Sequence, residues 1–62
     1  MRVYDLEGVI PENTWINVVN ALGDQGTYRG ISGIADYEIE NAEVLSMRAV
    51  GKDKITLTIE VI

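Results

Sequence analysis

The 62-residue sequence contains no cysteine and no histidine. Without cysteine there can be no disulfide, no zinc site built from thiolates and no cysteine nucleophile. Without histidine, the usual general base and the commonest metal ligand are missing as well. No other residue pattern has the strength of a catalytic or cofactor-binding motif. We therefore expect a protein that is not an enzyme and that holds no cofactor and no metal.

A long apolar run is also lacking. No segment reaches the roughly 18 consecutive apolar residues that a membrane span needs. The first ten residues, MRVYDLEGVI, have neither the apolar centre nor the small-residue cleavage site of a signal peptide. We expect a cytoplasmic protein that makes no contact with a membrane.

Basic residues are few. Ten acidic residues against five basic ones give a net charge of −5. The five cations are spread along the chain, at Arg2, Arg29, Arg48, Lys52 and Lys54. This balance opposes binding to nucleic-acid phosphates unless the cations cluster, so we expect no direct contact with nucleic acid. An acidic chain can instead dock onto basic proteins, because complementary fields speed association and select partners.

The chain is short enough that stability is a problem. Residues 1–62 make one small domain, and such domains bury only about 60% of the surface that their unfolded chains expose. The remaining supports are very well packed elements or self-association. Because 47% of the residues are hydrophobic, we expect an ordered fold and a homo-oligomer.

The first ten residues have apolar positions at helical spacing, namely Val3, Leu6, Val9 and Ile10. This spacing predicts a short amphipathic helix of two to three turns. Pro11 would end it, because the residue before a proline is pushed out of the helical region.

Two β-hairpins are predicted after the helix. Residues 14–22 and 27–31 flank the loop GDQG, and residues 43–50 and 55–62 flank the turn GKDK. The last strand alternates cleanly between apolar and polar residues, which predicts one buried face. The first strand does not alternate cleanly, so we expect both of its faces to be covered in part. The predicted fold is α+β: a short N-terminal helix plus a four-stranded antiparallel sheet, or a small SH3-like or Sm-like open barrel made of two hairpins.

The acidic stretch ADYEIE has three interpretations. If it is extended, Asp36, Glu38 and Glu40 share one side, as a site for a hard cation would require. The spacing does not match a calcium loop, so we disfavour a metal. We favour a connection that its apolar residues attach to the core, at Ile34, Tyr37 and Ile39. The third interpretation is an acidic docking surface for a basic partner, formed by Asp36, Tyr37, Glu38 and Glu40.

Three further residues are candidates for a ligand site or a subunit interface. Trp15 is the sole tryptophan, and a single indole in a strand is typical of a core or interface anchor. Tyr28 and Arg29 lie in the predicted returning strand, either as a stacking and hydrogen-bonding pair or as an ordinary half-exposed pair. The glycines around them have the wrong spacing for a phosphate-binding loop.

The order of these segments resembles small acidic proteins encoded by phages and prophages of Gram-positive bacteria. It is carried by VYDLEGVIPENTWINVVNA, then a glycine-rich turn and YRG, then DYEIENAEV, and finally SMRAVGKDKITLTIEV. The resemblance implies an accessory or counter-defence role without catalysis in the cytoplasm of the host cell. The partner would be a host protein or a protein of bacterial immunity. The resemblance transfers no functional residue.

Three functions are compatible with these residues. The first is a non-enzymatic interaction module that binds a protein partner through its acidic surface. The second is an oligomer that sequesters a small nucleotide-like ligand in pockets at its subunit interfaces, lined by Tyr28, Arg29 or Tyr37. The third is a minor structural subunit of a virion. We favour the first.

Overall fold

Residues 1–61, which the computed structural model describes, form four strands and three short helical segments. In chain order these are η1 (Val3–Leu6), β1 (Trp15–Asn20), β2 (Gln25–Arg29), η2 (Ile31–Gly33), α1 (Tyr37–Glu40), β3 (Glu43–Gly51) and β4 (Lys54–Glu60). The predicted strand position Ile62 lies outside the described residues. No helix within the described part of the chain is long and apolar enough to cross a membrane.

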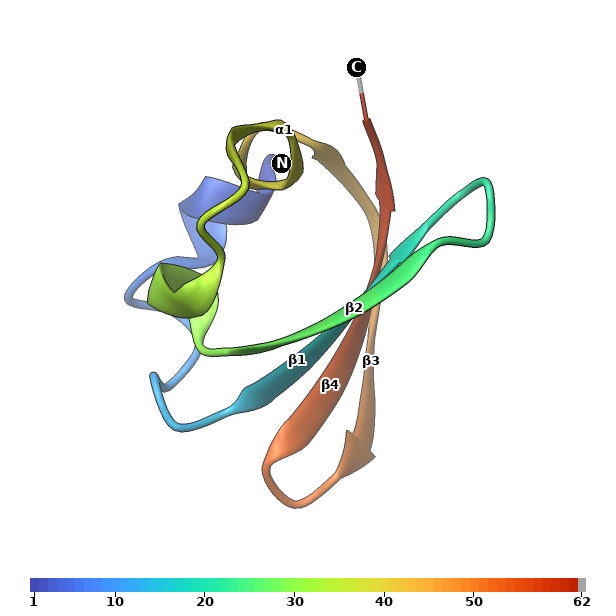
Figure 1. Ribbon diagram of the computed structural model, residues 1–62. Coiled ribbons are helices and arrows are strands. Elements are labelled where there is room, and N and C mark those ends of the chain that lie inside the picture. Colours follow the sequence, from blue (N-terminus) through green and yellow to red (C-terminus); the bar gives the residue numbers. More distant parts are fainter. Residues whose placement is uncertain (62) are drawn as a thin grey trace.

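Both predicted hairpins are confirmed. β1 pairs with β2 and β3 pairs with β4, each in antiparallel fashion. The four strands form one open sheet in the order β2-β1-β4-β3 (Figure 1). The prediction of a wholly antiparallel sheet is wrong at its centre, because β1 and β4 run parallel in a register that joins Trp15 to Lys54 and Asn20 to Ile59.

The parallel pair follows from the path of the chain between the hairpins. Residues 30–42 leave the edge strand β2, pass across one face of the sheet as η2 and α1, and deliver the chain to the opposite edge (Figure 1). β3 therefore forms that edge, and β4 returns beside β1. A crossover connection of about a dozen residues is what a parallel pairing requires.

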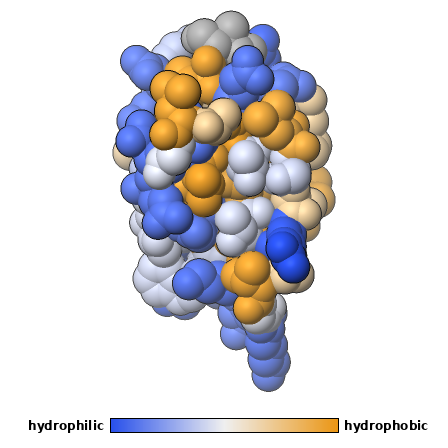
Figure 2. Space-filling model, turned by 90° about the vertical axis from the view of Figure 1, so that its right-hand side faces the viewer, coloured by the Kyte–Doolittle hydropathy of each residue, from blue (hydrophilic) through white to orange (hydrophobic). Residues whose placement is uncertain are grey.

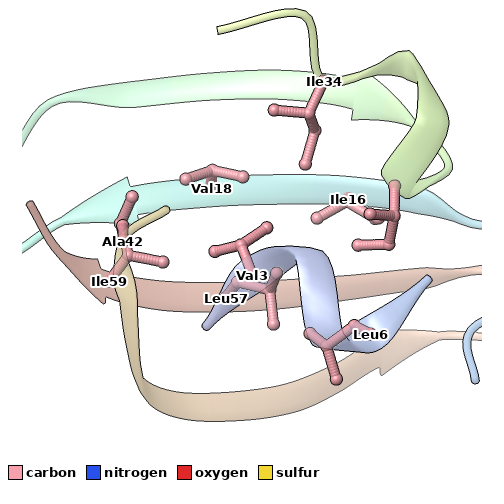
Figure 3. Packing of buried hydrophobic residues seen from close by; sticks show 9 residues of the cluster. Val3, Leu6, Ile16, Val18, Ile34, Ala42, Leu57 and Ile59 are labelled. Atoms are coloured by element: carbon pink, nitrogen blue, oxygen red, sulfur yellow. The ribbon is translucent and has the colours of Figure 1, made fainter. Parts of the chain in front are cut away.

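One apolar cluster fills the space between the sheet and the helical segments (Figure 3). Ile16 and Val18 of β1 and Leu57 and Ile59 of β4 form its floor, because alternate residues of a strand point to the same face. The remaining buried members come from η1 and from the crossover connection: Val3, Leu6, Ile31, Ile34 and Ala42.

The predicted N-terminal helix of two to three turns is wrong. Only Val3–Leu6 is helical, as a single 3₁₀ turn. Gly8 adopts a positive φ of 83°, and Val9 is 71% exposed. The turn is held instead by the residues around the start of β3, since Val3 N donates to Ala42 O at 3.0 Å and Val44 N donates to Met1 O at 2.8 Å. Backbone hydrogen bonds between the N-terminal residues and residues 42–44 therefore hold this segment in place of further helical turns.

The two faces of the sheet differ in cover. The helical segments all lie on one side, here called the core face (Figure 1). The other side, the outer face, carries the side chains of Gln25, Thr27, Arg29, Trp15, Asn17, Val19, Lys54, Thr56, Thr58, Glu60, Glu43, Ser46 and Arg48. No segment among residues 1–61 covers it, and Trp15 is 43% exposed there. On β1, Asn17 and Val19 point to the outer face and are half-buried, so the expectation that both faces of the first strand are covered in part is confirmed at these two residues.

Candidate functional site

The acidic stretch is helical and not extended. Asp36 is the N-cap of α1, and its Oδ1 accepts hydrogen bonds from the backbone N–H groups of Glu38 at 2.9 Å and Ile39 at 3.3 Å. A carboxylate at this position satisfies N–H groups that have no partner within the helix. The three carboxylates therefore do not form the single extended row that the alternation in ADYEIE suggested.

The side chains of α1 divide between the core and the solvent. Ile39 is half-buried against the core cluster, as expected for a residue that attaches the connection. Tyr37 is 77% exposed, so the prediction that it contacts the core is wrong. Its carbonyl oxygen accepts a hydrogen bond from Asn41 Nδ2 at 2.9 Å, which closes the single helical turn. Glu38 is exposed and Glu40 is partly buried.

A pocket of about 200 Å³ opens between α1 and the β1–β2 hairpin. Its apolar wall is formed by Val18, Tyr28, Ile39, Ile59 and Val61. Its polar lining is Asn20, Asp24, Gln25, Gly26, Asp36 and Glu38. We call it the acidic pocket, because three of its lining residues are acids and none is a cation.

The chemistry of the acidic pocket favours an organic cation. Its carboxylates attract a positive group, and its apolar wall can cover a hydrocarbon chain. No group of three or more Asp, Glu, His or Cys side chains within residues 1–61 is arranged to hold a metal ion. A lysine or arginine side chain combines the two properties that the lining offers, an apolar stem and a charged head.

Tyr28 belongs to this pocket through its position on the core face. It is half-buried, and its ring lies over Gly26, the next residue on the same side of β2. A Cβ added at Gly26 would lie 3.1 Å from the Tyr28 hydroxyl oxygen. The missing side chain at Gly26 thus leaves room for the tyrosine ring beside the pocket.

Trp15 and Arg29 lie on the opposite side of the sheet. They are register partners on β1 and β2, and the guanidinium carbon of Arg29 is 5.1 Å from the centroid of the Trp15 ring. This is cation–π geometry. The structure thus brings Trp15 and Arg29 together and separates both from Tyr28, because adjacent residues of a strand point to opposite faces.

Asp24 is the residue of the acidic pocket that the sequence did not single out. It lies in the turn between β1 and β2, at least 12 positions from the other two acids of the pocket. Only the fold of the crossover connection brings α1 over this hairpin. The sequence around Asp24 predicts a turn and gives no signal for the pocket.

Comparison with known proteins gives no relative. No protein-family model, no curated protein and no solved structure matches this chain.

Proposed function

We propose that this protein is a non-enzymatic interaction module that acts in the cytoplasm and receives a lysine or arginine side chain of a partner protein in the acidic pocket. The observation that carries the proposal is the pocket itself. It combines an apolar wall with Asp24, Asp36 and Glu38 and has no cation in its lining.

The energetics favour a cationic side chain over a neutral one. A hydrogen bond to a charged group contributes about 1.5–3 kcal/mol, roughly twice as much as a neutral one. The aliphatic stem adds the transfer of apolar surface out of water. The net charge of −5 also attracts a basic partner from a distance and speeds encounter.

The acids of the pocket have different tasks. Asp36 is engaged in capping α1, so its removal would disturb the helix together with any ligand contact. Asp24 and Glu38 are exposed and make no side-chain hydrogen bond or salt bridge within residues 1–61. We therefore assign the contact with the partner's charged head to Asp24 and Glu38, and a positioning task to Asp36.

The resemblance to small phage and prophage proteins supports a partner among the host's own proteins, including those of bacterial immunity. In that setting binding alone suffices for function, because a bound and blocked partner needs no chemical step. Self-association remains part of the proposal for so small a core.

The test uses NMR amide shifts of the protein titrated with short blocked peptides that contain lysine and arginine. We expect shifts at Gly26, Tyr28, Ile39 and Val61, which line the pocket. The double variant Asp24→Asn/Glu38→Gln should weaken binding by roughly tenfold or more, since one charge-assisted hydrogen bond accounts for that factor. Partner capture from host lysate should fall in parallel.

The matched control is Glu7→Gln/Glu12→Gln, which removes the same two charges at exposed positions outside the pocket. Equal weakening by both double variants would mean that net charge alone attracts the peptide, and the pocket assignment would be wrong. Peptides with glutamine in place of the basic residues should cause no shifts at the four pocket amides.

A second candidate function is sequestration of a small nucleotide-like ligand. It is favoured by one observation, the half-exposed indole of Trp15 with the Arg29 guanidinium over its ring. A base can stack on such a surface while the cation contacts phosphate. Native mass spectrometry of protein purified from its host separates the candidates. A bound small mass supports sequestration, and a captured protein supports the interaction module.

A further inference from the structure

The outer face carries its cations at one end. In the register of the sheet, Trp15 of β1 lies between Arg29 of β2 and Lys54 of β4. The turn that precedes β4 adds one further charge of each sign, Lys52 and Asp53. Two cations that are far apart in the sequence therefore flank one indole, a clustering that only the strand pairing produces.

The acids of the outer face lie at its other end. Glu43 of β3 and Glu60 of β4 are register partners. Lys54 and Glu60 are six residues apart on the same strand, which places them about 20 Å apart. Between the two ends the side chains are neutral except for Arg48: Asn17, Val19, Gln25, Thr27, Thr56, Thr58 and Ser46. Within residues 1–61, the face thus has two cations at one end and two acids at the other, with Arg48 as the one charged side chain between them.

Of the two acids, Glu43 is paired within the described part of the chain, whereas Glu60 and the cation Lys54 are not. The one salt bridge among residues 1–61 joins the N-terminal ammonium group to Glu43. Lys54 and Glu60 are exposed and make no salt bridge within the described residues. Figure 2, seen from the side away from the helical segments, shows pale and orange groups over most of the middle and blue groups at the upper end, along the left flank and at the lower end.

We propose that the outer face is an interface between two copies of this chain, packed sheet against sheet about a two-fold axis that lies across the strands. Such an axis places the positive end of one copy on the negative end of the other. Lys54 then faces Glu60 of the second copy, and the same pair recurs on the other side of the axis, as an isologous interface requires.

Charge selects this axis over the alternative. A two-fold axis along the strands would place Arg29 and Lys54 of one copy near the same cations of the other, and glutamates near glutamates. Like charges brought together at an interface cost several kcal/mol. With the axis across the strands and Lys54 opposite Glu60, Trp15 lies opposite Ala21 of the second copy, just beyond the end of β1, and the middle rows of the two sheets face each other.

The size of the face suits a small dimer. Four strands spaced about 4.8 Å apart and rows spaced about 6.7 Å apart span roughly 500 Å². Two copies would then bury about 1,000 Å², the lower limit of a specific interface. Each copy would cover about an eighth of its accessible surface of 4068 Å². Sheets pack in this aligned manner when their strands lie within about 30° of each other.

The test is a charge exchange read by sedimentation equilibrium. Lys54→Glu places an acid at each end of β4, and Glu60→Lys places a base at each end of it. Each alone should weaken the dimer by at least about tenfold, since like charges then meet twice. An equimolar mixture of the two variants should restore the dimer, because every contact in the mixed pair joins opposite charges.

Two controls keep the result interpretable. Glu12→Lys changes one charge outside the outer face and should leave the dimer unchanged. The circular dichroism spectrum of each variant reports whether the sheet is intact. The sole tryptophan provides a second reading, because its emission should shift to the red as a dimer that covers Trp15 dissociates on dilution.

Several outcomes would overturn the inference. One is a wild-type protein that stays monomeric at high concentration. Another is a dimer that survives Lys54→Glu and Glu60→Lys unchanged, which would locate the interface elsewhere. A third is a monomer whose Trp15 emission is quenched by a single-stranded oligonucleotide, which would make the outer face a nucleic-acid surface. None of these outcomes affects the acidic pocket, which lies on the core side and is tested by other variants.

Discussion

The two faces of the sheet are made by the same strands and yet meet different surroundings. On β4, Ile55, Leu57 and Ile59 point to the core face, while Thr56 and Thr58 point to the outer face. Leu57 is fully buried, and the two threonines are only partly covered. A central strand that is paired on both sides can therefore remain amphipathic. Strand pairing satisfies its backbone hydrogen bonds, and the burial of the side chains on each face depends only on what packs against that face.

The faces also divide the charge of the molecule. The acidic pocket lies at the border of the core face, where α1 approaches the first hairpin. The outer face instead gathers Arg29, Arg48 and Lys54. Although the net charge of the chain is −5, the acidic pocket has only acids among its charged residues, whereas the outer face carries charges of both signs. The comparison indicates that the core side suits a cationic partner and the outer side suits a surface with charges of both signs.

The largest expected effect is the loss of a core side chain on β4. Leu57→Ala should destabilise the protein by about 2–5 kcal/mol, because Leu57 is fully buried in the core cluster and its loss leaves a cavity there. Thr56→Ala, one residue away on the outer face, should cost less than about 1 kcal/mol. Urea unfolding followed by circular dichroism measures both.

This pair of variants tests the comparison directly. If Thr56→Ala at low protein concentration destabilised the protein as much as Leu57→Ala does, the outer face of the isolated chain would be covered and not open. If the cost of Thr56→Ala rises with protein concentration, the face is covered by a second copy.

A smaller effect is expected at the place where the chain leaves β2 for the core side. Gly30 has a φ of 72°, and a Cβ there would lie 2.5 Å from the carbonyl oxygen of Glu12. Gly30→Ala should therefore destabilise the protein by about 2 kcal/mol, since backbone strain and a steric clash add. Gly8 also has a positive φ, of 83°, but has no atom within 4 Å of such a Cβ.

Gly8→Ala is thus a matched control, because it introduces the backbone strain of a positive φ without a steric clash. It should lower the free energy of unfolding by about 1 kcal/mol. Thermal unfolding of the two variants gives the difference. Equal losses would show that the contact with the Glu12 backbone relaxes easily, and that the crossover connection is not held closely against the segment before β1.

The sequence predicts those parts of the fold that depend on local residue patterns, namely the two hairpins. The hairpin of β3 and β4 follows from the clean alternation at residues 55–61 and from the turn before it. The first hairpin follows from β-branched residues around a glycine-rich loop. The parallel pairing of β1 with β4 joins Trp15 to Lys54 and has no local signal, because it depends on the path of a connection between them.

The acidic stretch shows how two local patterns can compete. Alternation in ADYEIE favours a strand, while Asp36 followed by Glu38 is also a helix start, with a capping carboxylate and an acid in the first turn. The cap prevails here because Ile39 reaches the core from a helical turn. The acidic pocket could not be predicted, since Asp24 joins it only through tertiary structure.

The smallest expected effect is at the acidic end of the outer face. The N-terminal ammonium group donates a hydrogen bond to Glu43 Oε1 at 2.8 Å, and this contact and its charge hold the pKa of that carboxyl below its ordinary value. A carboxyl whose pKa is lower in the folded than in the unfolded state stabilises the fold above the unfolded pKa. That contribution is lost as the pH falls through the folded pKa.

Glu43→Gln should therefore lower the midpoint of urea unfolding slightly near neutral pH, and the difference from the wild type should vanish at a pH below both pKa values. High salt should reduce the difference, because the pair is exposed to solvent. Glu60→Gln removes the charge of the register partner of Glu43, which has no contact with the ammonium group, and is the control measured at low protein concentration. If the difference in unfolding midpoint between Glu43→Gln and the wild type persisted in strong acid, the ion pair would not be its cause. The loss would then come from the packing of the Glu43 side chain.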